Sequence, residues 1–112
     1  MILIIRKAVT PEQINQMTEQ FGSSFIKLAV DVSREILAGG GELHSDCEQA
    51  LLEDGSQQVD VWGADWHPES RNVTFESIIN MRPQQQNFSM EVQDLPLRNR
   101  IEKIVRELLE VA

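Results

Sequence analysis

The chain has 112 residues, 41% of them hydrophobic and 25% charged, which is the composition of one globular domain. No apolar run approaches the roughly 18 residues that a membrane-spanning helix needs. The N-terminal residues lack the leading positive charge and the small-residue cleavage site of a signal peptide, and the single Cys47 cannot form an internal disulfide. We therefore expect a single cytoplasmic domain over residues 1–112 that does not associate with membranes.

The net charge of −8 is unevenly distributed along the chain. Between Asp31 and Glu76 there are eleven acidic side chains against only two basic ones, Arg34 and Arg71, whereas the remainder is nearly balanced. Nucleic-acid binding depends on a basic face that neutralises phosphates, so we expect no nucleic-acid partner. An acidic segment suits a metal ion, a cationic partner or simply solubility.

The first elements in chain order are a strand, a helix and a second strand. Residues 2–5 form a continuous apolar run, which predicts a strand covered on both faces. Thr10 and Gln13 form a capping box around Pro11, which predicts a helix that Gly22 ends. Residues 25–32 alternate between apolar and polar positions and predict a strand. The order strand, helix, strand predicts a right-handed crossover and a parallel pair.

The next predicted elements are short. Residues 34–38 predict a further strand that runs into the glycines. Ser45 followed by Glu48 has the pattern of a capping box, which predicts a helix over residues 45–53 with Ser45 as its N-cap and Asp46 as its first residue.

The last third predicts a hairpin and a helix. Residues 58–66 and 72–81 alternate in hydropathy and are joined by a turn that contains Pro68. From about Leu95 an amphipathic helix follows, with Asp94 at its start. Together these elements predict an α+β fold: a single two-layer domain with a mixed sheet of about five strands and three helices.

The segment over residues 39–48 is the first candidate site, because it combines three glycines with His44, Cys47 and three carboxylates. Gly40 and Gly41 are candidate ligand-binding positions, since glycines before a helix can present N–H groups to an anion. The Lys of a phosphate-binding loop is missing, and nearby carboxylates would repel phosphate. We therefore favour a loop that needs positive φ or a close backbone approach.

Glu42, His44 and Asp46 occupy every second position, so in an extended segment they would share one face. Imidazole and carboxylates suit zinc, manganese or iron, and Asp31 or Asp65 could add a ligand. This makes the three residues candidate ligands of a divalent metal cofactor. Helix capping explains Asp46 equally well without a metal.

Cys47 in the first turn of a helix, with His44 three residues away, is a candidate nucleophile and base, and Asp65 is a third candidate catalytic residue. We favour a core position for Cys47, because free cysteine is among the most buried residue types and the nearby acids oppose thiolate formation.

Trp62, Trp66, Asn80 and Arg82 are further candidate ligand-binding residues. Trp62 and Trp66 alternate onto one face with Ala64, where indole rings could stack on a ligand or partner, although we favour a core position. The Arg82 guanidinium could hold a carboxylate ligand, and a salt bridge to a nearby acid is the favoured alternative.

The segments LAGGGELHSDCEQALLEDGSQQVDVWGADW (residues 37–66) and FESIINMRP (residues 75–83) resemble a small bacterial family of unknown function that has cyanobacterial members. The resemblance extends over most of the chain. It implies a cytoplasmic single-domain protein and supplies no activity, substrate or catalytic residue.

The leading hypothesis is a small acidic α+β protein that acts through partner binding or self-association, for instance as a homodimer, with the acidic middle and the strand of Trp62 and Trp66 as contact surfaces. The first alternative is a metal-dependent enzyme, such as a hydrolase, that uses Glu42, His44 and Asp46. A second alternative is a thiol enzyme built on Cys47 and His44.

Overall fold

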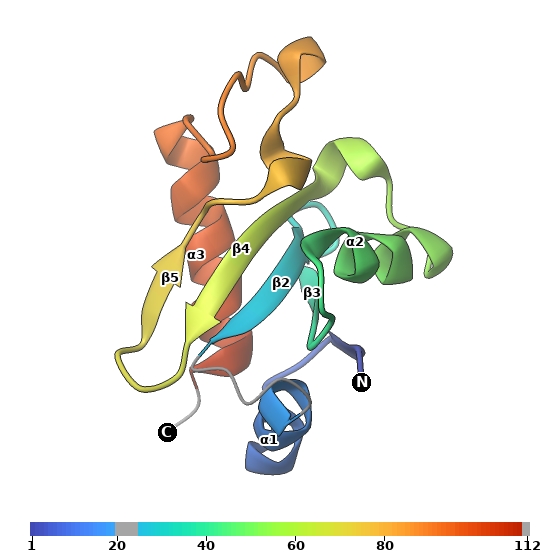
Figure 1. Cartoon of the computed structure of the whole chain (residues 1–112), viewed down its shortest axis with the longest axis vertical. Helices are drawn as coiled ribbons and strands as arrows, with labels where there is room; N and C mark the ends of the chain where they lie inside the picture. Colours follow the sequence, from blue (N-terminus) through green and yellow to red (C-terminus); the bar gives the residue numbers. More distant parts are fainter. Residues whose placement is uncertain (20–24, 111–112) are drawn as a thin grey trace.

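Antiparallel hairpins build the sheet of this protein (Figure 1). The computed structural model describes residues 1–19 and 25–110. The strands of the sheet are β1 (Leu3–Ile5), β2 (Ile26–Asp31), β3 (Ile36–Gly39), β4 (Val61–His67) and β5 (Asn72–Thr74). They lie in the order β1-β3-β2-β4-β5, and every neighbouring pair is antiparallel. The predicted α+β class and the five strands are confirmed, whereas the mixed sheet is not.

The parallel pair predicted from the order strand, helix, strand is wrong, because β3 lies between β1 and β2. A tight turn joins β2 to β3 and is closed by Asp31, whose Oδ1 accepts hydrogen bonds from the backbone N–H of Ser33 and Arg34, both at 2.9 Å. Closing this short loop costs less chain entropy than closing the longer crossover through the first helix. The local hairpin therefore takes the place beside β2.

Three helices surround the sheet: α1 (Pro11–Glu19), α2 (His44–Glu53) and α3 (Leu95–Leu109). The predicted capping box of α1 is confirmed, with the Thr10 N–H donating to Gln13 Oε1 at 3.0 Å and the Gln13 N–H to Thr10 Oγ1 at 3.2 Å. Asp94 caps α3 by accepting from the Leu97 N–H at 2.9 Å. The predicted helix end at Gly22 lies outside the described residues. None of the helices in the described ranges has the length and apolar character of a membrane span.

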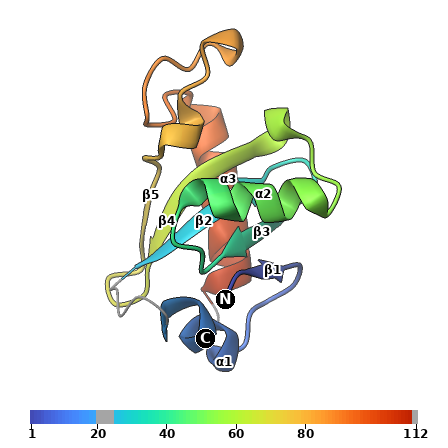
Figure 2. The same ribbon diagram turned by 45° about the vertical axis from the view of Figure 1, so that its right-hand side comes forward.

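The helices lie on both faces of the sheet, so the domain has three layers rather than the predicted two. Alternate residues of a strand point to opposite faces. Leu28 and Val30 of β2 pack in the cluster that contains α3, whereas Ala29 packs with Cys47 and Leu51 of α2. Figure 2 shows α2 in front of the sheet and α3 behind it.

Helix α2 begins two residues earlier than predicted. Its N-cap is Leu43, and the Asp46 carboxylate accepts from the Leu43 N–H at 3.3 Å. Asp46 therefore has the role that the sequence pattern assigned to Glu48, and Ser45 lies inside the helix. In the predicted and the observed arrangement alike, an acidic side chain three residues after the N-cap accepts a hydrogen bond from the backbone N–H of the N-cap residue.

The second arm of the predicted hairpin is much shorter than expected. β5 ends at Thr74, and residues 75–93, here called the irregular segment, continue through two 3₁₀ turns, η2 (Ile78–Asn80) and η3 (Pro83–Gln85). The Asn80 side chain takes the place of a paired strand at Gly63: its Oδ1 accepts from the Gly63 N–H at 2.8 Å and its Nδ2 donates to the Gly63 carbonyl at 3.0 Å. These bonds satisfy the edge of β4 without a strand beside it.

Candidate functional site

The structure brings His44 and Asp65 together on the α2 face of the sheet. His44 is the first residue of α2, and its Nε2 lies 2.8 Å from Asp65 Oδ1 and 3.2 Å from the Ala64 carbonyl oxygen. Both side chains are largely buried, with 12% and 15% of their surface exposed. With Nε2 protonated, the carboxylate fixes the ring and leaves Nδ1 as a proton acceptor.

The Nδ1 atom of His44 has no hydrogen-bond partner within residues 1–19 and 25–110. Beyond Asp65, weaker contacts continue across the sheet: Thr74 Oγ1 lies 3.5 Å from Asp65 Oδ2 and 3.3 Å from His67 Nε2. Thr74 was not predicted from the sequence, where its only signal was its position on the strand beside Asp65.

Cys47 does not join this pair. Its side chain is fully buried, and its thiol donates to the Lys27 carbonyl at 3.5 Å. Burial raises the pKa of the Cys47 thiol to about 11, and the nearby Asp46 carboxylate acts in the same direction. The expected core position is confirmed. A thiol in this state is a poor nucleophile near neutral pH.

The three candidate metal ligands have separate surroundings. Glu42 is exposed, His44 contacts Asp65, and Asp46 bonds back to the Leu43 N–H. Within the described residues, no group of three or more His, Cys, Asp or Glu side chains is placed to hold a metal ion. Asp31, the other carboxylate considered, is buried in the β2–β3 turn, where its Oδ2 has no partner among the described residues.

The glycines before α2 provide close backbone packing. Gly40 has φ +96°, and a Cβ there would overlap the Met1 carbonyl oxygen. A Cβ on Gly41 would lie 3.0 Å from Cys47 Sγ. Both glycines are buried. The expectation of positive φ and a close approach is therefore confirmed, and the Lys27 ammonium beside this loop donates to the Glu42 carbonyl at 2.8 Å.

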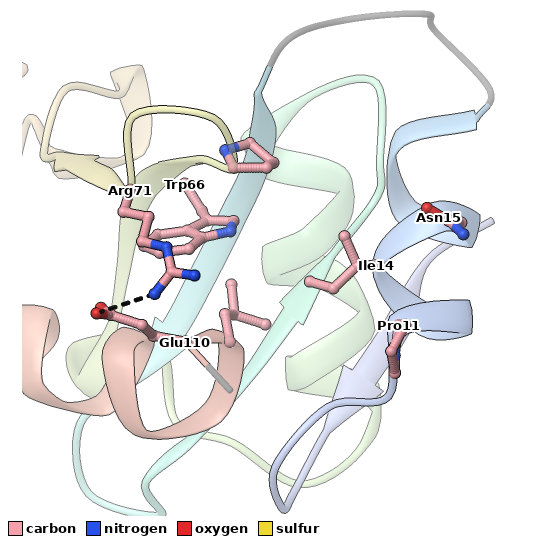
Figure 3. A pocket seen from close by; sticks show the side chains of 8 residues that line it. Pro11, Ile14, Asn15, Trp66, Arg71 and Glu110 are labelled. Carbon is pink, nitrogen blue, oxygen red and sulfur yellow. Dashed lines mark ion pairs between the residues drawn. The ribbon is translucent and has the colours of Figure 1, made fainter. Parts of the chain in front are cut away.

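Trp62 and Trp66 lie in the α3 core, with 4% and 3% of their surface exposed. The expected core position is confirmed, and neither residue can form an exposed contact surface. Each nevertheless borders a cavity. Trp62 lines a cavity of about 420 Å³ beside η3. Trp66 lines a cavity of about 240 Å³ between α1, the β4–β5 turn and the end of α3, which Figure 3 shows. Arg71 borders the second cavity, and no motif in the sequence indicated it.

Asn80 and Arg82 are buried inside the irregular segment. The Arg82 guanidinium donates to the carbonyl oxygens of Gln58, Ile79 and Val61 and lies 3.3 Å from the Glu48 carboxylate. It also lies 4.5 Å from the ring centroid of Trp62. Burial lowers the pKa of Arg82, while Glu48 opposes the shift. The expected salt bridge to a nearby acid is confirmed.

A group of exposed apolar side chains at one end of the molecule was not predicted from the sequence. Among the described residues, eight large apolar side chains are exposed, and six of them lie between positions 59 and 95. These six are called the apolar end here: Val59, Ile78, Met81, Phe88, Met90 and Leu95. They belong to η1 (Gln58–Asp60), the irregular segment and the start of α3, which lie at the top of Figure 1.

The fold and these surfaces define a small three-layer α+β domain with no assembled metal cluster among its described residues. The family model for proteins of unknown function called DUF5674 matches residues 3–108, so the chain belongs to this family. A search of curated proteins found no match, and neither did a search of solved structures. The predicted membership of an uncharacterised family is confirmed.

Proposed function

We propose that the protein acts by binding a partner protein through the apolar end. The observation that carries this proposal is exposure: Ile78, Phe88 and Leu95 each expose about two thirds of their surface, at 66%, 65% and 65%. Apolar side chains gathered at one end of a monomer are typical of interaction sites. This surface replaces the strand of Trp62 and Trp66, which the sequence suggested and burial excludes.

The backbone of the irregular segment beneath the apolar end supports binding because side-chain hydrogen bonds hold it in place. Asn87 Nδ2 donates to the carbonyl oxygens of Asn80, Ser89 and Glu91 at 2.7, 2.9 and 2.9 Å. The backbone that carries Phe88 and Met90 is thereby fixed before a partner arrives. A surface ordered in advance loses less conformational entropy on binding.

The charges around the apolar end indicate the chemistry of the partner. Glu76 and Glu91 are exposed and face each other in an isolated antiparallel bridge, and Asp94 is exposed next to Leu95. The only Lys or Arg between positions 72 and 97 is Arg82, which is buried, and the half-buried Arg98 that follows lies over the Phe75 ring, 4.7 Å from its centroid. Like charges directly opposite one another are unfavourable, and a cation placed between them relieves the repulsion. The surface therefore suits an apolar segment that carries Lys or Arg.

The same charges oppose self-association through this end. In a two-fold dimer the same patch meets itself, so each carboxylate would approach a carboxylate of the second copy. A basic amphipathic helix has both the apolar and the cationic groups that complement this surface.

The experiment uses a fluorescein-labelled amphipathic helix of Leu and Lys, about 18 residues long, in an anisotropy titration. We expect saturable binding that the double variant Ile78→Ser/Phe88→Ser weakens at least about tenfold. Glu76→Gln/Glu91→Gln should weaken it less and reduce its salt dependence. Leu43→Ser is the matched control, because Leu43 is 53% exposed but lies outside the apolar end.

Equal binding by the wild type, Ile78→Ser/Phe88→Ser and Leu43→Ser would show that the apolar end does not hold the peptide and would refute the proposal. Light scattering supplies the second arm. A wild-type dimer that becomes monomeric in the Phe88→Ser variant would make a second copy the partner and would contradict the charge argument.

A second candidate function is acid–base chemistry at His44, which the contact with Asp65 favours. The ring is held at Nε2, and its Nδ1 has no hydrogen-bond partner among the described residues, the arrangement that a general base requires. Diethyl pyrocarbonate acylates accessible imidazole nitrogens, so mass spectrometry of the treated native protein should find the adduct on His44. An unmodified His44 would exclude this role. The metal-dependent alternative has no comparable support, because Glu42, His44 and Asp46 do not converge among the described residues.

A further inference from the structure

The cavity beside Trp66 lies at the opposite end of the molecule from the apolar end (Figures 1 and 3). It has a volume of about 240 Å³. Its walls come from three elements that are distant in the sequence: Pro11 and Ile14 from α1, Trp66 and Pro68 from β4 and the turn after it, and Leu109 from α3. Most of the lining is therefore apolar, as in small-molecule sites.

A buried polar group is left without a partner at this cavity. Trp66 is 3% exposed, and its indole N–H donates no hydrogen bond to any described residue. Figure 3 shows this nitrogen on the side of the ring that faces Ile14. A buried Trp usually has a partner for its N–H, and here the cavity is the place for one.

The mouth of the cavity carries a guanidinium with unused donors. Arg71 Nη1 lies 3.7 Å from Glu110 Oε1, which is too long for a hydrogen bond. The same carboxylate is already held by Arg106, whose Nη1 lies 2.7 Å from Glu110 Oε2. Arg71 can therefore turn to another anion without leaving Glu110 unpaired.

The backbone of Arg71 is fixed at this mouth. Its φ is +61°, its N–H donates to the His67 carbonyl at 2.7 Å, and its carbonyl accepts from Arg106 Nη1 at 3.0 Å. The base of the Arg71 side chain thus stays beside the cavity while the guanidinium, whose side chain is 60% exposed, keeps its freedom.

We propose that this cavity binds a small apolar carboxylate, such as an aromatic or branched aliphatic acid, with the apolar body beside Trp66 and the carboxylate on Arg71. A cavity of about 150 Å³ lined by apolar side chains holds benzene, so the larger cavity here has room for a ring and a short acidic group. A guanidinium binds a carboxylate with two parallel hydrogen bonds, which gives the site its selectivity for acids. The Trp66 N–H donates to an oxygen of the ligand.

The test uses the full chain with Trp62→Phe, so that Trp66 is the only fluorophore of its kind. Phenylacetate, cyclohexanecarboxylate and isovalerate are titrated up to about 10 mM, tenfold above a millimolar Kd. We expect at least one of them to change the Trp66 emission saturably. Arg71→Gln should weaken that binding at least about tenfold, and Arg100→Gln, a change of an exposed arginine outside the cavity, should leave it unchanged.

A neutral probe separates the two parts of the site. Phenylacetamide has nearly the shape of phenylacetate but no charge, so we expect it to bind at least about tenfold more weakly. No saturable change with any of the three acids would overturn the proposal. Equal binding of phenylacetate and phenylacetamide, or equal effects of Arg71→Gln and Arg100→Gln, would overturn it as well. Loss of peptide binding in the apolar-end variants has no bearing on these outcomes.

Discussion

The sheet with its helices buries mostly apolar side chains, whereas the irregular segment buries several polar ones as well. In the sheet the interior is made of residues such as Leu28, Val30 and Ile101, and their shape is maintained by close packing. In the irregular segment Asn80, Arg82 and Asn87 are buried as well as Phe75 and Val92, while other apolar side chains such as Phe88 are exposed. Directed hydrogen bonds therefore contribute much of the shape of this segment, and several of its apolar side chains are left at the surface.

The largest expected effect comes from removing the central amide of the irregular segment. Asn80→Ala should lower the free energy of unfolding by about 3–5 kcal/mol, because it leaves the buried N–H and C=O of Gly63 without partners and removes one of the two hydrogen bonds to the Phe75 carbonyl. Urea denaturation of the variant measures this loss. Asn72→Ala, at an exposed asparagine of β5, is the matched control and should change stability by less than about 0.5 kcal/mol. Similar losses in both variants would remove the distinction between the two regions.

Close packing beside the sheet is tested at two glycines that share a backbone conformation. Gly40 and Gly55 have φ values of +96° and +105°, but a Cβ would meet the Met1 carbonyl only at Gly40 and nothing within 4 Å at Gly55. We expect Gly55→Ala to cost about 1 kcal/mol from conformation alone and Gly40→Ala about 3 kcal/mol. The difference in thermal unfolding between the two variants measures the contribution of packing, and equal costs would refute it.

Cys47 makes the stability of the α2 layer dependent on pH. The pKa of its thiol is about 11 in the folded state against an ordinary value of 9.0, so between these values the unfolded chain loses the thiol proton while the folded chain retains it. Stability should therefore be unaffected below about pH 8 and should fall by up to about 2–3 kcal/mol as the pH rises through 9 to 11. Cys47→Ala should remove this part of the slope in urea titrations. An unchanged slope would show that other groups cause it.

The smallest effect on stability is expected at the apolar end. Phe88→Ser should change the free energy of unfolding by less than about 0.5 kcal/mol, because the side chain is 65% exposed. Ile101→Ala, at a fully buried position of α3, should cost about 2–5 kcal/mol. Chemical denaturation of the pair tests the comparison directly. A large loss for Phe88→Ser would mean that this residue supports the fold and would weaken its assignment to binding.

Local chemistry made part of the fold predictable from the sequence. Thr10 with Gln13 and Asp94 before Leu97 were recognisable caps, because each bonds a backbone group within three residues. The order of the sheet was not predictable in this way, since the short apolar run of β3 does not specify the strand beside which it lies. The predicted strand over residues 72–81 ends at Thr74 because the buried Asn80 side chain, and not a strand, bonds to Gly63. The alternation there reflects the burial of residues such as Phe75, which does not require strand pairing.

The sequence indicated which residue types could form the candidate site, but not which of these residues contact one another. His44 and Asp65 are 21 positions apart, and their contact depends on where α2 crosses β4. Arg82 and Glu48 are 34 positions apart, and the acidic middle offered many equivalent partners. The cavity beside Trp66 combines α1, a turn and the end of α3, so no short motif could indicate it. Burial, in contrast, was predictable for Cys47 and the tryptophans from their residue types.

The hydrogen bonds that Asn80 and Arg82 make along β4 have a consequence for the behaviour of the protein in concentrated solution. Beyond the three-residue β5, a bare strand edge would offer unpaired N–H and C=O groups on which another chain could form an intermolecular sheet. At Gly63 both groups are bonded to Asn80, and the Val61 carbonyl is bonded to Arg82. Side chains that cannot extend into a further strand thus close this part of the β4 edge to pairing with another chain.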